Sequence, residues 1–166
     1  MRLRGIFLGF FLVTTVGAAS AQTAIYAEFS AAQSDAQVND WIYGPTVGLY
    51  HDTGHHVVAL GEDVRGTFLN HNGVQIDSGL IGGRVVVTPH VLPIKPDVEA
   101  LAGVGRYSAN STATMDFEYQ FLGGVDFTFF PRVDWRVAEF SYGGISVLNG
   151  SYNPKTVSMG LVFRLP

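Results

Sequence analysis

The charged side chains of this chain fall at alternate positions of apolar segments, a spacing that suits ion pairing. Asp63 and Arg65 share one parity within their segment, as do Glu118 and Asp126 within theirs. A closed interior must pair the charges that it buries, and one arginine can bond two carboxylates. The pattern therefore predicts an internal network of structural ion pairs. Its predicted members are Asp63, Arg65, Arg84, Glu99, Glu118, Asp126, Arg136, Glu139 and Arg164.

Histidine is the other residue type that could support chemistry. His51, His55 and His56 lie close together in the sequence, whereas His71 and His90 are isolated. A zinc site needs three or four converging ligands, and the chain contains no cysteine. A lipid hydrolase would need a serine, histidine and acid on one outer face, and no histidine fits there. The sequence predicts no enzyme, no catalytic residue, no cofactor and no metal site.

The elements that must position these charges are β-strands. Apolar and polar residues alternate along most of the chain, and no helical periodicity of 3.6 residues competes with them. The clearest segment places Phe117, Phe121 and Phe127 on one parity and Glu118 and Asp126 on the other. We therefore expect an all-β fold, an eight-stranded antiparallel up-and-down transmembrane β-barrel with its charged parity in the lumen. The predicted strands span 23–30, 44–52, 56–68, 79–88, 96–107, 116–129, 132–142 and 155–165.

The predicted connections alternate between short and long. Residues 52–55 and 130–132 form tight turns, whereas longer polar links lie at 31–41, 69–78, 108–115 and 143–154. In outer-membrane barrels the short turns lie in the periplasm and the long loops outside the cell. An even number of strands then leaves both termini periplasmic. The long links, rich in Asn, Ser and Gly, are where an unidentified surface ligand could bind.

One predicted strand contains an irregularity. Arg136 and Glu139 fall on opposite parities, although both are unsuited to a lipid-facing position. A β-bulge at Val137 and Ala138 would turn both side chains inward and leave Trp135 facing lipid. The alternative is that Glu139 lies beyond the hydrocarbon, where either parity is tolerated. The bulge is the favoured interpretation.

The N-terminal 21 residues have the pattern of a secretory signal peptide. Arg2 and Arg4 precede a short apolar stretch at 6–16, and residues 19–21 fit a cleavage site. We expect cleavage to leave a barrel domain at 22–166. Two of the 10 basic residues lie in the signal, which leaves 8 against 14 acidic residues, a net charge of −6. This balance excludes nucleic acid as an expected partner, because phosphate binding needs a basic surface.

The last strand carries a pattern that is typical of outer-membrane barrels. Ser158, Gly160, Phe163 and Leu165 match the closing-strand signal that the barrel-assembly machinery is thought to recognise. The match makes that machinery an expected partner. The chain ends in Pro166 rather than in an aromatic residue, which departs from the usual pattern.

Several motifs together resemble a known family. They are the segment 44–50, the segment 123–127 followed by Pro131, the pair Trp135 and Arg136, and the terminal strand. On these motifs the mature chain resembles the small eight-stranded outer-membrane barrels of the OmpA and opacity-protein type. The resemblance implies a Gram-negative outer membrane, contact with its lipids, a largely plugged interior, a monomer, and a structural or adhesive role.

Two other functions fit parts of the pattern. A narrow passive pore for ions or small solutes would use the same fold, but paired lumen charges disfavour it. A soluble lipocalin-type barrel would need an apolar lumen and a polar exterior, the reverse of the parity in segments 116–129 and 155–165. The outer-membrane barrel is therefore the preferred interpretation.

Overall fold

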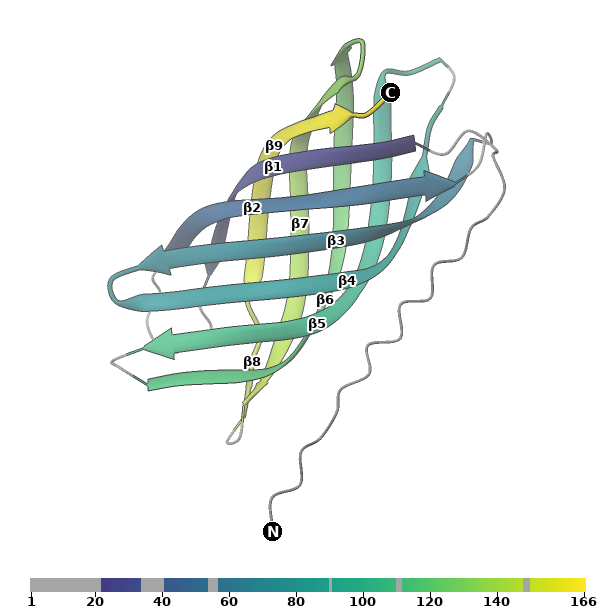
Figure 1. Ribbon diagram of the computed structural model, residues 1–166. Helices are drawn as coiled ribbons and strands as arrows, with labels where there is room; N and C mark the ends of the chain where they lie inside the picture. The colour runs from purple at the N-terminus through teal and green to yellow at the C-terminus, as the bar shows by residue number, and fades with distance from the viewer. Residues whose placement is uncertain (1–21, 34–40, 54–56, 90, 110–111, 148–149) are drawn as a thin grey trace.

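A single antiparallel sheet closes on itself in the computed structural model (Figure 1). The structure describes residues 22–33, 41–53, 57–89, 91–109, 112–147 and 150–166, so the predicted signal peptide lies outside the described residues. No helix in this part of the chain is long and apolar enough to cross a membrane. The strands are β1 (Gln22–Gln33), β2 (Trp41–Thr53), β3 (Val58–His71), β4 (Val74–Val87), β5 (Ile94–Ala109), β6 (Thr112–Phe130), β7 (Val133–Val147), β8 (Gly150–Tyr152) and β9 (Lys155–Arg164).

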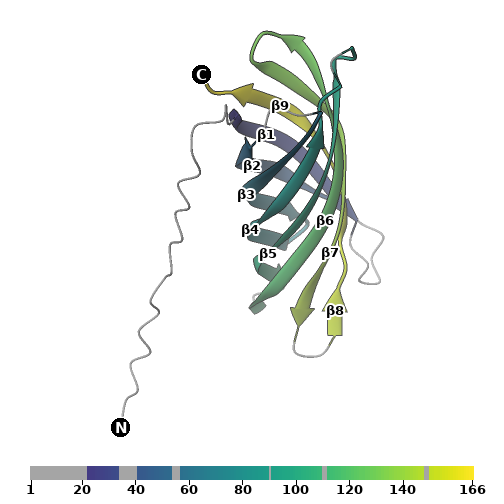
Figure 2. The ribbon, with the colours of Figure 1, turned by 90° about the vertical axis from the view of Figure 1, so that its right-hand side faces the viewer.

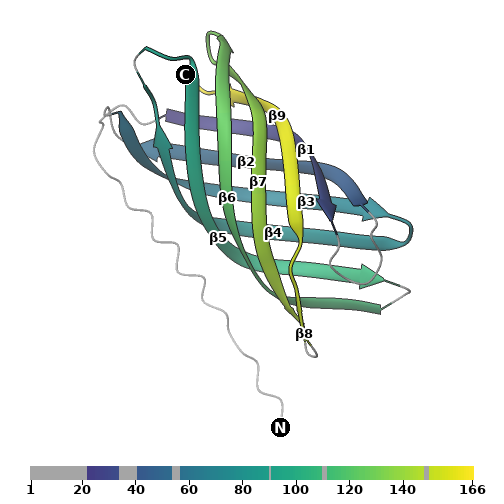
Figure 3. The same ribbon diagram turned by 180° about the vertical axis from the view of Figure 1, so that it is seen from behind.

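Each long strand pairs with its neighbours in the sequence, and the barrel closes where β1 meets β9. The β1–β9 register runs from Ala24 opposite Arg164 to Gln33 opposite Lys155, and β6 pairs with β7. Figure 3 shows β9 between β1 and β7. The short β8 pairs only with β7 and extends that hairpin beyond the barrel wall (Figure 2). Within the described residues, eight strands form the wall, which confirms the predicted fold.

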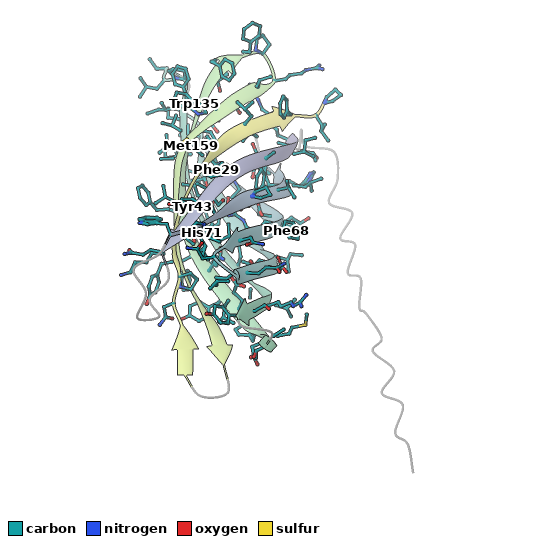
Figure 4. All side chains as sticks on the ribbon, turned by 90° about the vertical axis from the view of Figure 1, so that its left-hand side faces the viewer. Phe29, Tyr43, Phe68, His71, Trp135 and Met159 are labelled. Carbon is teal, nitrogen blue, oxygen red and sulfur yellow. The ribbon has the colours of Figure 1, made fainter. Side chains whose placement is uncertain are left out.

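The two faces of the wall differ sharply in chemistry. Phe121 is 59% exposed on the outside, whereas Arg84 and Asp126 are 2% and 0% exposed in the interior. Figure 4 shows Phe29, Tyr43 and other large side chains on the outer wall. The apolar parity therefore faces outward and the charged parity inward, as the sequence predicts. The soluble lipocalin-type alternative is wrong, because it needs the opposite arrangement.

Both ends of the barrel can be identified from the chain path. The start of β1 and the C-terminus lie at one end, together with the β2–β3, β4–β5 and β6–β7 connections (Figure 1). We call this the terminal end. The opposite end carries the β1–β2, β3–β4, β5–β6 and β7–β9 connections, and we call it the loop end. This division is the one that the alternating connections predict.

The predicted long link at 69–78 is wrong. β3 continues to His71, which pairs with Val74 of β4, so that only Asn72 and Gly73 form the turn. Both turn residues have positive φ, 48° and 79°, as a two-residue hairpin with an Asn-Gly sequence requires. The link at 108–115 is also shorter than predicted, since β5 and β6 pair as far as Ala109 and Thr112.

Gly73→Val is expected to lower the free energy of unfolding by about 1–2 kcal/mol, because a β-branched residue is strained at positive φ. Chemical unfolding in detergent micelles measures the change. Gly79→Val on β4 is the matched control, since a Cβ at either glycine meets nothing within 4 Å but only Gly73 has positive φ. Equal losses in the two variants would contradict the strained turn.

The predicted bulge in β7 is confirmed. Val125 pairs with Ala138 and Asp126 with Arg136, so Val137 has no partner on β6. The register of β7 with β9 shifts at the same place. The extra residue turns both charged side chains inward, where Arg136 is 0% and Glu139 1% exposed.

Candidate functional site: ion pairs inside the barrel

Arg136 of β7 lies at the centre of a cluster of buried charges. Its Nε donates to Asp126 Oδ1 at 2.8 Å, and its Nη1 donates to Glu28 Oε1 at 2.8 Å and Glu139 Oε2 at 2.8 Å. These carboxylates come from β6, β1 and β7. The bulge is what allows Arg136 and Glu139 of the same strand to meet in the interior.

Arg65 of β3 forms a second centre that shares a carboxylate with the first. Its Nη1 donates to Glu139 Oε1 at 2.7 Å and its Nη2 to Glu99 Oε2 at 3.0 Å. Asp63 Oδ1 lies 3.6 Å from Arg65 Nε. Arg65 Nη2 also donates to Glu139 Oε2 at 3.2 Å, so this pair is bidentate and stronger than a single hydrogen bond. Glu139 therefore bridges Arg65 and Arg136 across the lumen.

Arg84 of β4 has looser contacts than the other two arginines. Its nitrogens lie 3.5 Å from Asp97, 3.7 Å from Glu99, 3.7 Å from Asp126 and 3.6 Å from Asp52. Its guanidinium carbon is 3.8 Å from the centroid of the Tyr50 ring, a cation–π distance.

Tyr26 of β1 supports the other two arginines. The guanidinium carbons of Arg65 and Arg136 lie 5.5 Å and 4.9 Å from its ring centroid. Its hydroxyl donates to Asp63 Oδ1 at 2.9 Å. The tyrosine therefore fills space between two cations and also satisfies one acid.

Acids outnumber bases in this central cluster. Among the described residues, three buried arginines face seven buried acids drawn from β1, β2, β3, β5, β6 and β7. No group of three or more histidine, aspartate or glutamate side chains is placed to hold a metal ion in the described chain. Chemically, the arrangement can fill the lumen and cross-link the wall. The acids are Glu28, Asp52, Asp63, Asp97, Glu99, Asp126 and Glu139.

Two further layers separate the charges from the loop end. Buried hydroxyls form a hydrogen-bonded row. Ser30 Oγ lies 2.7 Å from Thr46 Oγ1 and 2.8 Å from Ser158 Oγ, and Thr46 Oγ1 donates to Thr67 Oγ1 at 3.1 Å. Beyond them an apolar cap of buried side chains packs together across the lumen. The cap consists of Ala32, Ile42, Leu69, Ile76 and Ile145.

A separate polar cluster lies at the terminal end. Asp134 of β7 accepts from Lys95 Nζ at 2.9 Å and from Thr128 Oγ1 at 2.6 Å, and Arg164 Nε lies 3.2 Å away. Asp134 is fully buried, whereas both of its cations retain some exposure. Arg164 thus pairs here and not with the central cluster.

The structure brings together seven of the nine predicted network residues. Arg164 lies apart with Asp134, and Glu118 lies apart beside Gln120, which donates to it at 2.6 Å. Sequence reasoning missed Glu28, Asp52 and Asp97 of the central cluster. The signal was present, because each shares its parity with residues of the buried face, such as Ser30 for Glu28.

Comparison with known proteins rests on structure, since no protein-family profile and no curated protein sequence matches this chain. Neisserial surface protein A superposes with a TM-score of 0.61, at 16% identity, over 88% of this chain and 99% of that one. Ail, the attachment invasion locus protein of Yersinia pestis, superposes with a TM-score of 0.54 at 11% identity, over 87% of this chain and 97% of that one. This chain has the fold of the small eight-stranded outer-membrane barrels.

In this outer-membrane barrel fold, three of the four predicted assembly-signal residues lie on β9 and divide between its two faces, while Leu165 follows the end of the strand. Ser158 and Gly160 face the lumen, where Ser158 joins the hydroxyl row and Gly160 lies opposite both Glu28 and Arg136. Phe163 and Leu165 are exposed. The residues are thus placed to close the wall, and their recognition by an assembly machinery stays a prediction.

The described histidines lie near the two rims of the barrel. Near the terminal end, His51 Nδ1 is 2.8 Å from Thr23 Oγ1. Near the loop end, the His71 ring packs edge-on against the Tyr43 ring, with 5.8 Å between the ring centroids. His55, His56 and His90 lie outside the described residues. The two described histidines are on separate parts of the wall and do not converge.

Proposed function

We propose that this chain is a monomeric, non-enzymatic β-barrel of a bacterial outer membrane with a structural or surface-interaction role. In this proposal its lumen is closed by ion pairs and does not conduct. The observation that carries the proposal is the set of three buried arginines held among seven buried acids inside the barrel. An eight-stranded wall encloses only enough space for side chains, so such a cluster fills the passage.

The outer wall supports the membrane location. Its exposed residues are mainly large and apolar, such as Phe117, Phe140 and Met159, an arrangement that water disfavours and lipid accepts. Trp41, Tyr43 and Tyr142 are exposed toward the loop end, and Trp135 and Phe163 toward the terminal end. Two aromatic belts of this kind are typical of the membrane–water interfaces.

The sidedness and export of the protein are parts of the same proposal. Residues 1–21 would direct export and then be cleaved. The barrel-assembly machinery would recognise β9 and insert the domain 22–166 into the membrane. The terminal end would then lie in the periplasm and the loop end at the cell surface. Ail, one of the structural neighbours, has been crystallised with the heparin analogue sucrose octasulfate. We assign any comparable surface contact of this chain to the loop end.

Planar-bilayer recording tests whether the lumen is closed. The purified, refolded protein is expected to give no stepwise conductance above the bare bilayer, because ion pairs, hydroxyls and an apolar cap lie in series along the lumen. Heat-modifiable migration in detergent gels first verifies that the barrel is folded. Reproducible single-channel steps from folded protein would overturn the closed lumen and favour the narrow pore.

A further inference from the structure

The outer wall has a hollow over β3, β4, β5 and β6. Its lining includes the small, exposed residues Gly83 and Ala100, and a Cβ on Gly83 would meet nothing within 4 Å. The hollow measures about 730 Å³, within the size range of small-molecule sites. Larger apolar side chains of the outer parity also line it, namely Leu60, Val85, Val98 and Phe121.

A row of polar side chains leads into this hollow from the terminal end. Along the hydrogen-bonding direction, Thr23 of β1 is opposite His51 of β2, His51 is opposite Glu62 of β3, and Glu62 is opposite Gly83. Thr23 and His51 share a hydrogen bond of 2.8 Å. Glu62 is exposed on the outer face between Leu60 and Val64. A carboxylate is therefore placed at the edge of an apolar depression.

We propose that the hollow and Glu62 together bind one phospholipid with an ammonium headgroup, of the phosphatidylethanolamine class. The inference rests on the proposed membrane location. An acyl chain occupies the hollow between Leu60 and Phe121, where it covers apolar surface that the wall leaves uncovered. The ammonium group lies against the Glu62 carboxylate, toward the terminal end, where the row of polar residues begins.

Charge complementarity selects this occupant over others. An anionic phospholipid would bring like charge to Glu62, which is unfavourable. A second copy of the chain would need a cation at this level, and the exposed cations of the described residues are Arg106, Lys155 and Arg132. Arg106 and Lys155 belong to the loop-end halves of β5 and β9, and copies in one membrane share their orientation. Arg132 lies at the terminal end, but in the β6–β7 turn beyond the last pair of that hairpin, Phe130 with Val133. Glu62 lies inside the paired part of β3, opposite His51 and Gly83, so Arg132 of a second copy is not at its level.

Native mass spectrometry of the full barrel domain tests the proposal. The protein is released from detergent that contains equal amounts of phosphatidylethanolamine and phosphatidylglycerol with identical acyl chains. The unmodified protein is expected to retain phosphatidylethanolamine about fivefold more often, as one partly exposed ion pair would give. Glu62→Gln should bring the ratio close to one. Gly83→Leu, which fills the hollow, should abolish retention of both lipids.

The control variant is Gly79→Leu. Gly79 lies on the same face of β4 as Gly83, and its added Cβ also meets nothing within 4 Å, but it does not line the hollow. It should retain lipid as the unmodified protein does. An unchanged lipid ratio in Glu62→Gln, unchanged retention in Gly83→Leu, or a dimer that disappears in Gly83→Leu would overturn the lipid site.

Failure of this inference can be distinguished from failure of the proposed function. Flotation with liposomes and heat-modifiable migration report membrane insertion and folding without depending on lipid identity. A protein that inserts and folds but shows no lipid preference refutes the site alone. A folded protein that does not float with liposomes refutes the membrane location on which the site depends.

Discussion

Arg136→Met is expected to lower the free energy of unfolding by about 3–5 kcal/mol, the usual cost of removing one partner from a buried ionic cluster. Arg136 contacts Glu28, Asp126 and Glu139, each at 2.8 Å. Without the guanidinium, Glu28 loses its ion pair with Arg136, and the excess of buried negative charge grows. Urea titration in phospholipid micelles, followed by tryptophan fluorescence, measures the loss.

Arg106→Met is the matched control for this prediction. It removes the same charge and introduces the same side chain, but from an exposed position on β5. Its unfolding midpoint is expected to stay unchanged, since isolated surface substitutions have small effects. If Arg136→Met does not fold, the double variant Glu28→Gln with Arg136→Met should recover part of the folded fraction. Equal midpoints for Arg136→Met and Arg106→Met would contradict a central role for Arg136.

The interior of the barrel was largely predictable because strand parity is a local property. Alternation assigns Arg65, Asp126 and Glu99 to the lumen without any knowledge of their partners. The bulge at Val137 was predictable for the same reason, since two charged residues on opposite parities cannot both face inward in a regular strand. The fold class, and whether each side chain points into the lumen or outward, therefore follow from short stretches of sequence.

Pairing across the lumen could not be predicted in the same way. Which charges meet depends on the stagger between strands and on their tilt, and neither is encoded in one strand. Glu118 shares a strand face with Asp126 but lies several residues closer to the loop end, beyond the reach of the arginines. Arg164 lies near the terminal end and meets Asp134 there. The parity of these two residues therefore indicated which side of the wall they face, but not which partners they meet.

β3 and β4 extend further toward the loop end than the sequence predicts, because polar residues in a segment were interpreted as a loop. Asn70 and Gln75 pair within the β3–β4 ladder, although both are polar and exposed. A strand that extends beyond the hydrocarbon can carry polar residues on its outer face, because water replaces lipid as its surroundings. In the proposed membrane location, polarity on the outer face marks where the wall leaves the hydrocarbon, whereas turn residues such as Gly73 mark where the strand ends.

Gly160→Val is expected to prevent most of the protein from reaching the closed barrel, with a loss of at least about 3 kcal/mol, at the upper end of the cost of overpacking. Gly160 on β9 lies directly opposite Glu28 of β1 and Arg136 of β7. A Cβ at this position would meet the Ala27 carbonyl oxygen and come within 2.6 Å of the Glu28 Cα and 2.8 Å of its Cγ. The added side chain therefore pushes against the backbone at the seam where the barrel closes.

The same substitution also disrupts the ionic cluster, because the Arg136–Glu28 pair at 2.8 Å joins β7 to β1 across β9 at Gly160. The folded fraction is measured by heat-modifiable migration after refolding into lipid. Gly79→Val adds the same side chain where a Cβ meets nothing within 4 Å, and it should fold as the unmodified protein does. Normal folding of Gly160→Val would mean that the seam tolerates a side chain between Glu28 and Arg136. The ion pair would then not depend on the close approach of β9 to its two neighbours.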